Sequence, residues 1–456
     1  MNVTKRQAGM PISVPEVQVV RQPGLSQLNQ LRVRRPVRNQ VEMMLRDLDS
    51  LIPEDHPVRA IWDYLQRLDL SSFYASIKAT LDTPGRPASD PQVILGLWIY
   101  AITEDVGSAR YLGQLCQEHD AYRWLCGGIP VDYHLLSNFR VSHQAELDKL
   151  LTTIIATMMD QKLVTLKRVA HDGTRLRASA GRGSFRRKDS LHRCLAEAEE
   201  QVKRLNAEGE HPDGEVSLRQ RAARERAARE RQERVQAALQ ELPAVEAAKE
   251  RQQHTKSKKD RSKIKEARVS TTEPQSRVMR LADGGFSAAH NVQFSTDVGS
   301  GVIVGAMVTN EGSDKGKQVE EMEEQVVERS GKHPEDYLID GGFAELGTIN
   351  ALTKRGLTVY APLREPKSKT KKSSEKRQGD SPAVLAWRQR METEEAKEIY
   401  KLRAATAEWT NAQIRCHGLR RFTVRGLDKA LSIVLLVAIA HNLLRWIALM
   451  PQGVMN

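Results

Sequence analysis

The stretch that decides the fold is NVQFSTDVGSGVIVGAMVT, residues 291–309. Two apolar, β-branched runs, at 291–297 and 302–309, flank the turn sequence Val-Gly-Ser-Gly. Runs of this length and composition, joined by a short glycine turn, predict a β-hairpin. The protein is therefore expected to build its core around a sheet.

Segments on both sides of this hairpin extend the sheet and cover it. In chain order we expect a strand at 163–172, the hairpin, a helix at 317–330, a strand at 337–340, a helix, a strand at 357–361, and helices at 383–416 and 427–449. The order β-β-β-α-β-α-β-α predicts a mixed α/β fold with helices flanking the sheet.

Composition and periodicity divide the 456 residues into four predicted parts. Residues 1–40 are rich in proline, arginine and glutamine, which predicts a flexible basic arm. Residues 41–160 show short helices joined by glycine turns, a pattern compatible with helix-turn-helix DNA binding. The α/β domain comprises 161–180 and 271–456. Between its two pieces, 181–270 carries RAARERAARERQERVQAALQ, which predicts a charged helical or coiled-coil insertion.

The positive charge is concentrated in three segments. The chain carries a formal net charge of +12, while residues 1–40, 181–270 and 364–380 alone carry net charges of +6, +7 and +4. Basic arms and insertions of this kind commonly bind phosphates, which favours a nucleic-acid partner. Simple solvation of these segments is the alternative.

Cysteine usage and hydropathy indicate the compartment. The four cysteines are scattered without a CxxC pair, which argues against a disulfide scaffold and a zinc knuckle and fits a reducing cytoplasm. The first residues lack the apolar core of a signal peptide. The apolar run Ile433–Ala440, interrupted by His441 and Asn442, predicts a buried helix with no membrane partner.

Three carboxylates are candidates for chemistry. Asp172 and Asp340 each stand at the end of a predicted strand, and Glu408 lies in a helical run. Three such side chains can share two Mg²⁺ ions, with Mn²⁺ as a substitute, for two-metal phosphodiester chemistry. Asp-Gly is also a common turn, and Glu408 alone could simply face solvent.

Two neighbouring features limit these assignments. DGGF occurs at both Asp283 and Asp340, and we interpret the first as a turn because VMRLA before it is a poor strand. His171 points to the face of its strand opposite Asp172, which favours packing over catalysis.

Several segments in fixed order resemble a known family. They are HDGTRLRASA (171–180), EPQSRVMRLADGGFSAAHNVQFSTD (273–297), VTNEGSD (308–314), YLIDGGF (337–343) and YKLRAATAEWTNAQIRCHGLRRFTVRG (400–426). Together they resemble bacterial insertion-sequence transposases of the DDE class. The branch is that of insertion sequence eleven-eighty-two, within the four/five-like group, and 90–128 resembles the N-terminal domain of that group.

The resemblance implies an RNase H-like DDE catalytic domain with Asp172, Asp340 and Glu408 as catalytic and metal-binding acids. The family signature has three residues between its Arg and Glu, whereas four separate Arg403 from Glu408, which leaves the role of Arg403 open. Arg415 stands where the signature has Lys. Two smaller departures are Glu273, where the family pattern has Asp, and His290, where it has Tyr.

The resemblance further implies the reaction and its partners. The expected function is binding of the element's terminal inverted repeats in double-stranded DNA, followed by metal-dependent strand cleavage and strand transfer into target DNA. Self-association to at least a dimer on DNA and a cytoplasmic, nucleoid-associated location are expected. The candidate DNA contacts are Arg140, Tyr400, Arg403, Arg415, Arg420 and Arg421.

Other functions remain open from the sequence. The chain could be a non-catalytic, domesticated or decayed DNA-binding protein, or a metal nuclease without strand transfer. The insertion at 181–270 could be a dimerisation hairpin or a DNA clamp.

Overall fold

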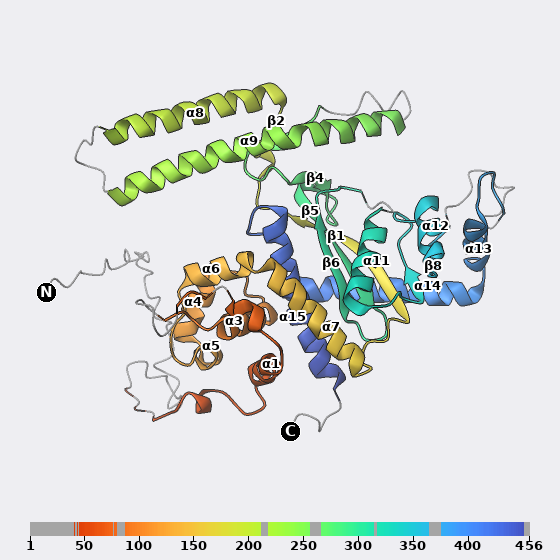
Figure 1. The fold of residues 1–456 in the computed structure, drawn as a ribbon, viewed down its shortest axis with the longest axis horizontal. Helices are drawn as coiled ribbons and strands as arrows, with labels where there is room; N and C mark the ends of the chain where they lie inside the picture. Colours follow the sequence, from red (N-terminus) through yellow and green to blue (C-terminus); the bar gives the residue numbers. More distant parts are fainter. Residues whose placement is uncertain are drawn as a thin grey trace, which may run out of the picture. The chain divides into compact units, whose positions relative to one another are not determined.

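The computed structural model describes residues 41, 43, 45–75, 77–79, 87–210, 218–255, 266–313, 317–363 and 375–450 (Figure 1). The chain divides into two units, Met1–Arg46 and Asp47–Asn456, and every described helix and strand belongs to the second. The predicted basic arm at 1–40 lies outside the described residues, as does most of the basic segment 364–380.

A six-stranded mixed sheet organises the second half of the chain. Its strands are β1 (Arg168–Arg177), β4 (Arg277–Arg280), β5 (Phe286–Asp297), β6 (Ile303–Thr309), β7 (Asp336–Leu338) and β8 (Thr358–Tyr360). The order is β4-β5-β1-β7-β8, with β6 also paired to β5. β1, β7 and β8 are parallel, whereas β5 runs antiparallel to its neighbours. The predicted mixed sheet and the β5–β6 hairpin are confirmed.

The predicted end of the strand at Asp172 is wrong. β1 begins at Arg168, passes through Asp172 and ends at Arg177, with all but its first residue paired to the twelve-residue strand β5. Gly173 lies opposite Gln293, and a Cβ built at 173 would lie 2.5 Å from that side chain's Nε2 atom. The glycine therefore permits a close approach between strands rather than a chain reversal.

The two DGGF sequences behave differently. The first forms the β4–β5 turn, where the amide of Leu281 donates to the carbonyl of Gly285, so that prediction is confirmed. The segment before it nevertheless forms strand β4, because β5 supplies its hydrogen-bonding edge. The second DGGF begins at Asp340, two residues beyond β7, so this acid does stand at a strand end.

After β6, five helices alternate with or follow the remaining strands. They are α11 (Lys317–Ser330), α12 (Leu346–Lys354), α13 (Pro382–Arg390), α14 (Glu394–Cys416) and α15 (Leu427–Leu449). The continuous helical segment expected at 383–416 is two helices, because Thr393 caps a new one by accepting a hydrogen bond from the amide of Ala396. α14 packs on β1, where it contributes to the candidate site described below.

The described residues before β1 form helices only. They are the 3₁₀ turn η1 (Asp49–Leu51), α1 (Pro57–Gln66), α2 (Ser71–Tyr74), α3 (Pro91–Thr103), α4 (Ala109–Glu118), α5 (Asp120–Leu125), α6 (Tyr133–Ser142) and α7 (Gln144–Asp160). Asp90 starts α3 by accepting a hydrogen bond from the amide of Gln92. One hydrophobic core runs from these helices into the sheet.

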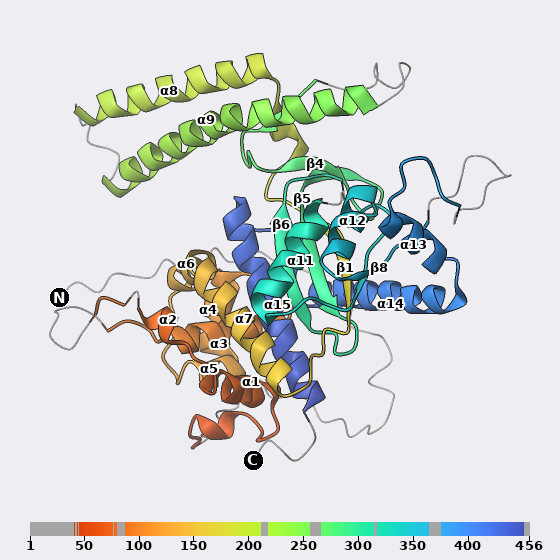
Figure 2. The ribbon, with the colours of Figure 1, turned by 45° about the vertical axis from the view of Figure 1, so that its right-hand side comes forward.

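α15 joins the helical layer to the sheet. It contacts α3, α6 and α7 on one side and β6 on the other (Figure 2). Among the described helices it is the one long and apolar enough to cross a membrane, yet 72% of its most apolar window is buried inside the protein. The polar residue Asn442 of this helix is also bound inside the protein, since its side chain hydrogen-bonds both the amide and the carbonyl of Ile303 at 2.8 Å.

The charged insertion is a pair of helices. α8 (Lys188–Glu210) and α9 (Leu218–Thr255) lie side by side (Figure 1). A small two-stranded sheet, β2 (Phe185–Arg186) with β3 (Val269–Ser270), closes their base. The seam between them is small and apolar, and Leu191, Ala238 and Leu242 are buried in it. Whether the hairpin serves dimerisation or DNA binding stays open.

Candidate active site

Two of the three predicted acids converge on one guanidinium. Asp172 projects from the middle of β1, and its Oδ1 atom lies 2.7 Å from Nη2 of Arg403. Asp340 follows β7, the parallel neighbour of β1, and its Oδ1 atom lies 3.9 Å from Nη1 of the same arginine. The Arg403 side chain is 13% exposed, whereas the Asp172 and Asp340 side chains are 25% and 50% exposed. Adjacent parallel strands thus bring together carboxylates 168 residues apart in the chain.

One face of α14 supports this arrangement. Arg403, Ala407 and Asn411 recur every four residues and therefore lie on one side of the helix. Asn411 donates from Nδ2 to Oδ2 of Asp172 at 3.1 Å, so both carboxylate oxygens are held. Ala407 is buried between them, and its small side chain fits the close contact of α14 with β1. Sequence reasoning missed Asn411, although its spacing from Arg403 was a usable signal.

Glu408 lies on another side of α14. Its position is offset by five from that of Arg403, which corresponds to about 140° around an α-helix. Its side chain is exposed, and the position that the shorter family spacing would give to glutamate is taken by buried Ala407. Within the described part of the chain, no three His, Cys, Asp or Glu side chains gather closely enough to hold a metal ion. The role of Glu408 therefore stays a prediction.

The donor set at Asp172 and Asp340 fits one divalent cation. Both carboxylates already share a single positive group, so their negative charges act on the same space. Mg²⁺ is typically held by one or two carboxylates and completes its shell with water and substrate oxygens. The guanidinium of Arg403 neutralises the charge that such a cation would use, so a cation and Arg403 would compete for these oxygens.

His171 is a packing residue, as predicted. It is fully buried, its Nδ1 atom lies 3.3 Å from the hydroxyl of Ser295, and its ring meets Phe343 edge-on. Burial, reinforced by the positive charge of Arg403, lowers the pKa of His171 to about 3. The ring is consequently neutral at physiological pH.

The predicted DNA contacts separate into exposed and buried groups. Arg415, Arg420 and Arg421 are exposed near the N-terminal side of α15. Arg415 reaches the hydroxyl of Thr174 on β1 at 3.4 Å, and Arg420 pairs with Asp105 at 2.7 Å. Arg415 thus links α14 to the sheet, and Arg420 links the loop after α14 to the helical layer.

Tyr400 and Arg140 lie deeper. Tyr400 is half-buried, and burial raises the pKa of its phenol. Arg140 is 9% exposed, its guanidinium lies over the Trp98 ring, and it donates to the carbonyl of Gly107 at 2.7 Å. These contacts hold Arg140 inside the helical layer, and its role as a DNA contact stays a prediction.

Two family models match parts of the chain. Residues 46–142 match a transposase domain (DUF772), and residues 364–447 match a transposase DDE domain. The second match includes Tyr400, Arg403 and Glu408 but neither aspartate. No curated protein and no solved structure matches the chain. The two matches support an insertion-sequence transposase of the DDE class and a DNA substrate.

Proposed function

We propose that this protein is a DNA transposase that binds the terminal inverted repeats of its own element, cleaves DNA strands and transfers them to target DNA. The observation that carries the proposal is the convergence of Asp172 and Asp340 on Arg403, at the helix that belongs to the segment matching a DDE domain. A nuclease site of this class needs carboxylates brought together from distant parts of the chain.

The fold assignment is part of the proposal. The central strand β1 carries the first acid, an antiparallel pair β5–β6 flanks it on one side, and parallel β7 and β8 flank it on the other. This order supports an RNase H-like catalytic domain formed by 161–180 and 271–456, interrupted by the insertion at 181–270.

Each residue of the site has a proposed role. Asp172 and Asp340 would hold a divalent cation, Mg²⁺ or Mn²⁺, and Glu408 would complete the ligands for a second ion after α14 or its neighbourhood rearranges on DNA. When bound, these ions supply activation of the attacking oxygen and neutralisation of charge at the phosphodiester. Asn411 orients Asp172 through its hydrogen bond. Before DNA and a cation bind, Arg403 would hold the two aspartates together. A DNA phosphate is an alternative partner for its guanidinium.

DNA binding would involve surfaces beyond the acid pair. The helical segment 41–160 would contact the element ends, as its match to a transposase domain supports. Arg415, Arg420 and Arg421 are exposed cations that suit backbone phosphates. Joining two ends in one complex requires at least two protein copies on DNA, so we propose a dimer there and a cytoplasmic location close to the nucleoid.

The test uses a plasmid that carries the inverted repeats read from the DNA flanking the gene. Wild type and Asp340→Asn are incubated with it, with and without Mg²⁺ or Mn²⁺, and broken strands are mapped. We expect metal-dependent breaks at the element ends in wild type only. Glu328→Gln, which removes a carboxylate from α11 instead, is the matched control and should cleave normally.

Other outcomes select other functions. End binding without any break by wild type would indicate a site-occupying DNA-binding protein and would remove the catalytic assignments. Breaks without joined products would indicate a metal nuclease that lacks strand transfer.

A further inference from the structure

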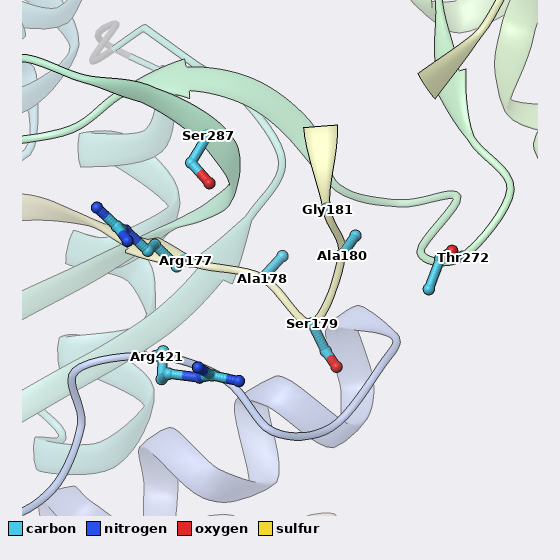
Figure 3. A pocket seen from close by; sticks show the side chains of 8 residues that line it. All are labelled: Arg177, Ala178, Ser179, Ala180, Gly181, Thr272, Ser287 and Arg421. Atoms are coloured by element: carbon cyan, nitrogen blue, oxygen red, sulfur yellow. The ribbon is translucent and has the colours of Figure 1, made fainter. Parts of the chain in front are cut away.

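A cavity of about 450 Å³ lies at the C-terminal end of β1 (Figure 3). Its polar lining comes from Arg177, Arg421, Ser179, Thr272 and Ser287, and its remaining lining residues are alanine or glycine. Arg177 is five residues beyond Asp172 along β1, which is roughly 17 Å in an extended strand. An odd number of residues also places the two side chains on opposite faces of the strand, so this cavity is a separate site.

Four separate chain segments converge on the cavity. Ser179 lies on the chain leaving β1 for the α8–α9 hairpin, and Thr272 lies on the chain returning from it. Ser287 belongs to β5, and Arg421 to the loop before α15. Figure 3 shows Arg421 directed toward Ser179. A ligand here would connect the root of the hairpin to the catalytic sheet.

The charge of the cavity favours an anion. Among the described residues, none of those that line it is acidic. Arg177 and Arg421 are neighbours across an isolated parallel bridge, and Asp283 pairs with Arg177 at 2.8 Å. Arg421 has no carboxylate partner within the described chain. Three hydroxyl donors complete a lining that matches the oxygens of a phosphate group.

The loop that carries Arg421 is held in place. The next residue, Phe422, donates its amide to the carbonyl of Arg177 at 2.8 Å and is buried against His290. Gly426 donates its amide to Oε1 of Glu273 at 2.7 Å. Glu273 is itself fully buried, so both departures from the family pattern, Glu273 and His290, serve to fix this loop. A preorganised arginine loses less conformational freedom on binding a ligand.

We propose that this cavity binds a backbone phosphate of DNA at the root of the α8–α9 hairpin, with Arg421 as its principal charged contact. The proposal rests on the proposed function, because it takes DNA as the ligand. It adds a positioning site roughly 17 Å along β1 from Asp172, where the bound DNA strand fixes the hairpin relative to the catalytic sheet.

The first experiment measures the affinity of the full chain for DNA carrying the inverted repeats as a function of salt. Arg421→Ala should weaken binding about tenfold and reduce the slope of log affinity against log salt by about one, which is the effect of removing one phosphate interaction. Lys332→Ala is the matched control, because Lys332 is exposed and donates to the carbonyl of Thr165 at 2.8 Å, just before the start of β1. Arg177 is the last residue of this ten-residue strand, roughly 30 Å from its start.

A second variant tests the cavity without changing charge. Ser179→Leu fills the space between the arginine and the hairpin root and should weaken DNA binding to a similar extent. Neutral methylphosphonates are then placed at single positions of the DNA. At one position, the methylphosphonate should weaken binding by wild type but not by Arg421→Ala. At the other sensitive positions, it should weaken binding by both proteins equally.

The outcomes separate the inference from the function it rests on. If wild type binds the ends but Arg421→Ala keeps the salt slope and the methylphosphonate profile of wild type, the phosphate site is refuted and the transposase proposal stands. If wild type does not bind the ends, both are refuted. Inorganic phosphate that binds wild type but not Arg421→Ala, without any effect on DNA binding, would assign the cavity to a free anion and overturn the DNA site.

Discussion

Replacing Arg403 by glutamine should expose how strongly the candidate site depends on one ion pair. In the double-mutant cycle of Arg403→Gln and Asp172→Asn, we expect a coupling free energy of about 2 kcal/mol. Removing one partner of a fully buried pair costs about 3–5 kcal/mol, whereas fully exposed pairs contribute about 0–1 kcal/mol. The Arg403 and Asp172 side chains are 13% and 25% exposed, so this pair lies between those limits. The contact to half-exposed Asp340 at 3.9 Å adds less than about 1 kcal/mol.

The chain contains a matched control for this measurement. Arg420 and Asp105 lie at the same distance of 2.7 Å, but their side chains are 62% and 43% exposed. The cycle of Arg420→Gln and Asp105→Asn should give at most about 0.5 kcal/mol. Both cycles are measured by urea unfolding at low salt with a chelator present. Equal coupling energies in the two cycles would refute the argument that burial sets the strength of the Arg403 pair.

The same variant tests the cation site. In Arg403→Gln, the carboxylates of Asp172 and Asp340 lose their neutralising group, so Mg²⁺ should stabilise the variant more than wild type, where the cation must displace the guanidinium. A ligand present at a hundred times its dissociation constant stabilises the folded state by about 2.7 kcal/mol. Titration of unfolding free energy with Mg²⁺, using Arg420→Gln as the reference, measures the difference. No greater stabilisation of Arg403→Gln would show that the two aspartates do not form a cation site.

Three further predictions concern the scaffold. Burial lowers the pKa of His441 to about 4, so its contribution to stability is complete above pH 6.5 and is lost as the pH falls toward 4. Between these two pH values, the unfolding free energy should drop by up to about 1.4 kcal/mol per pH unit more than in His441→Gln. Asn442→Leu removes the side chain that hydrogen-bonds the buried amide and carbonyl of Ile303, and it should destabilise the fold by about 2–4 kcal/mol in urea unfolding. A destabilisation below about 1 kcal/mol would show that these hydrogen bonds contribute little. Replacing 188–266 by a short glycine linker should leave the near-UV circular dichroism of the remaining chain intact, because α8 and α9 form their own small core. The oligomeric state of this variant and its binding to the element ends decide between a dimerisation role and a DNA-binding role for the hairpin.

Local patterns were sufficient for much of the fold. The Val-Gly-Ser-Gly turn, the amphipathic helix at 317–330 and the apolar helix at 427–449 appear where their residues predict them. Each depends on neighbours a few residues away, through turn geometry, helical periodicity or capping. The same local reasoning failed at Asp172, because strand β5, more than a hundred residues later, extends β1 through a sequence that resembles a turn.

The candidate site shows the same division between local and distant causes. Residue type and position in the chain identified Asp172, Asp340 and Glu408 as candidate acids, and the resemblance to a family pointed to Arg403. That Arg403 faces both aspartates, that Asn411 supports one of them and that Glu408 faces away depend on how α14 is rotated against β1. The phosphate cavity could not be predicted from the sequence, because Arg177, Thr272 and Arg421 meet only where the chain returns from the hairpin to the sheet.

The sequence by itself therefore determined the class of fold, the order of its elements and the residues able to bind cations or phosphates, because these follow from side-chain chemistry and short-range periodicity. The tertiary structure alone decided which of those residues share a site. Strand pairing and helix packing join distant positions, such as Asp172 and Asn411, which are 239 residues apart, and no local pattern carries that information.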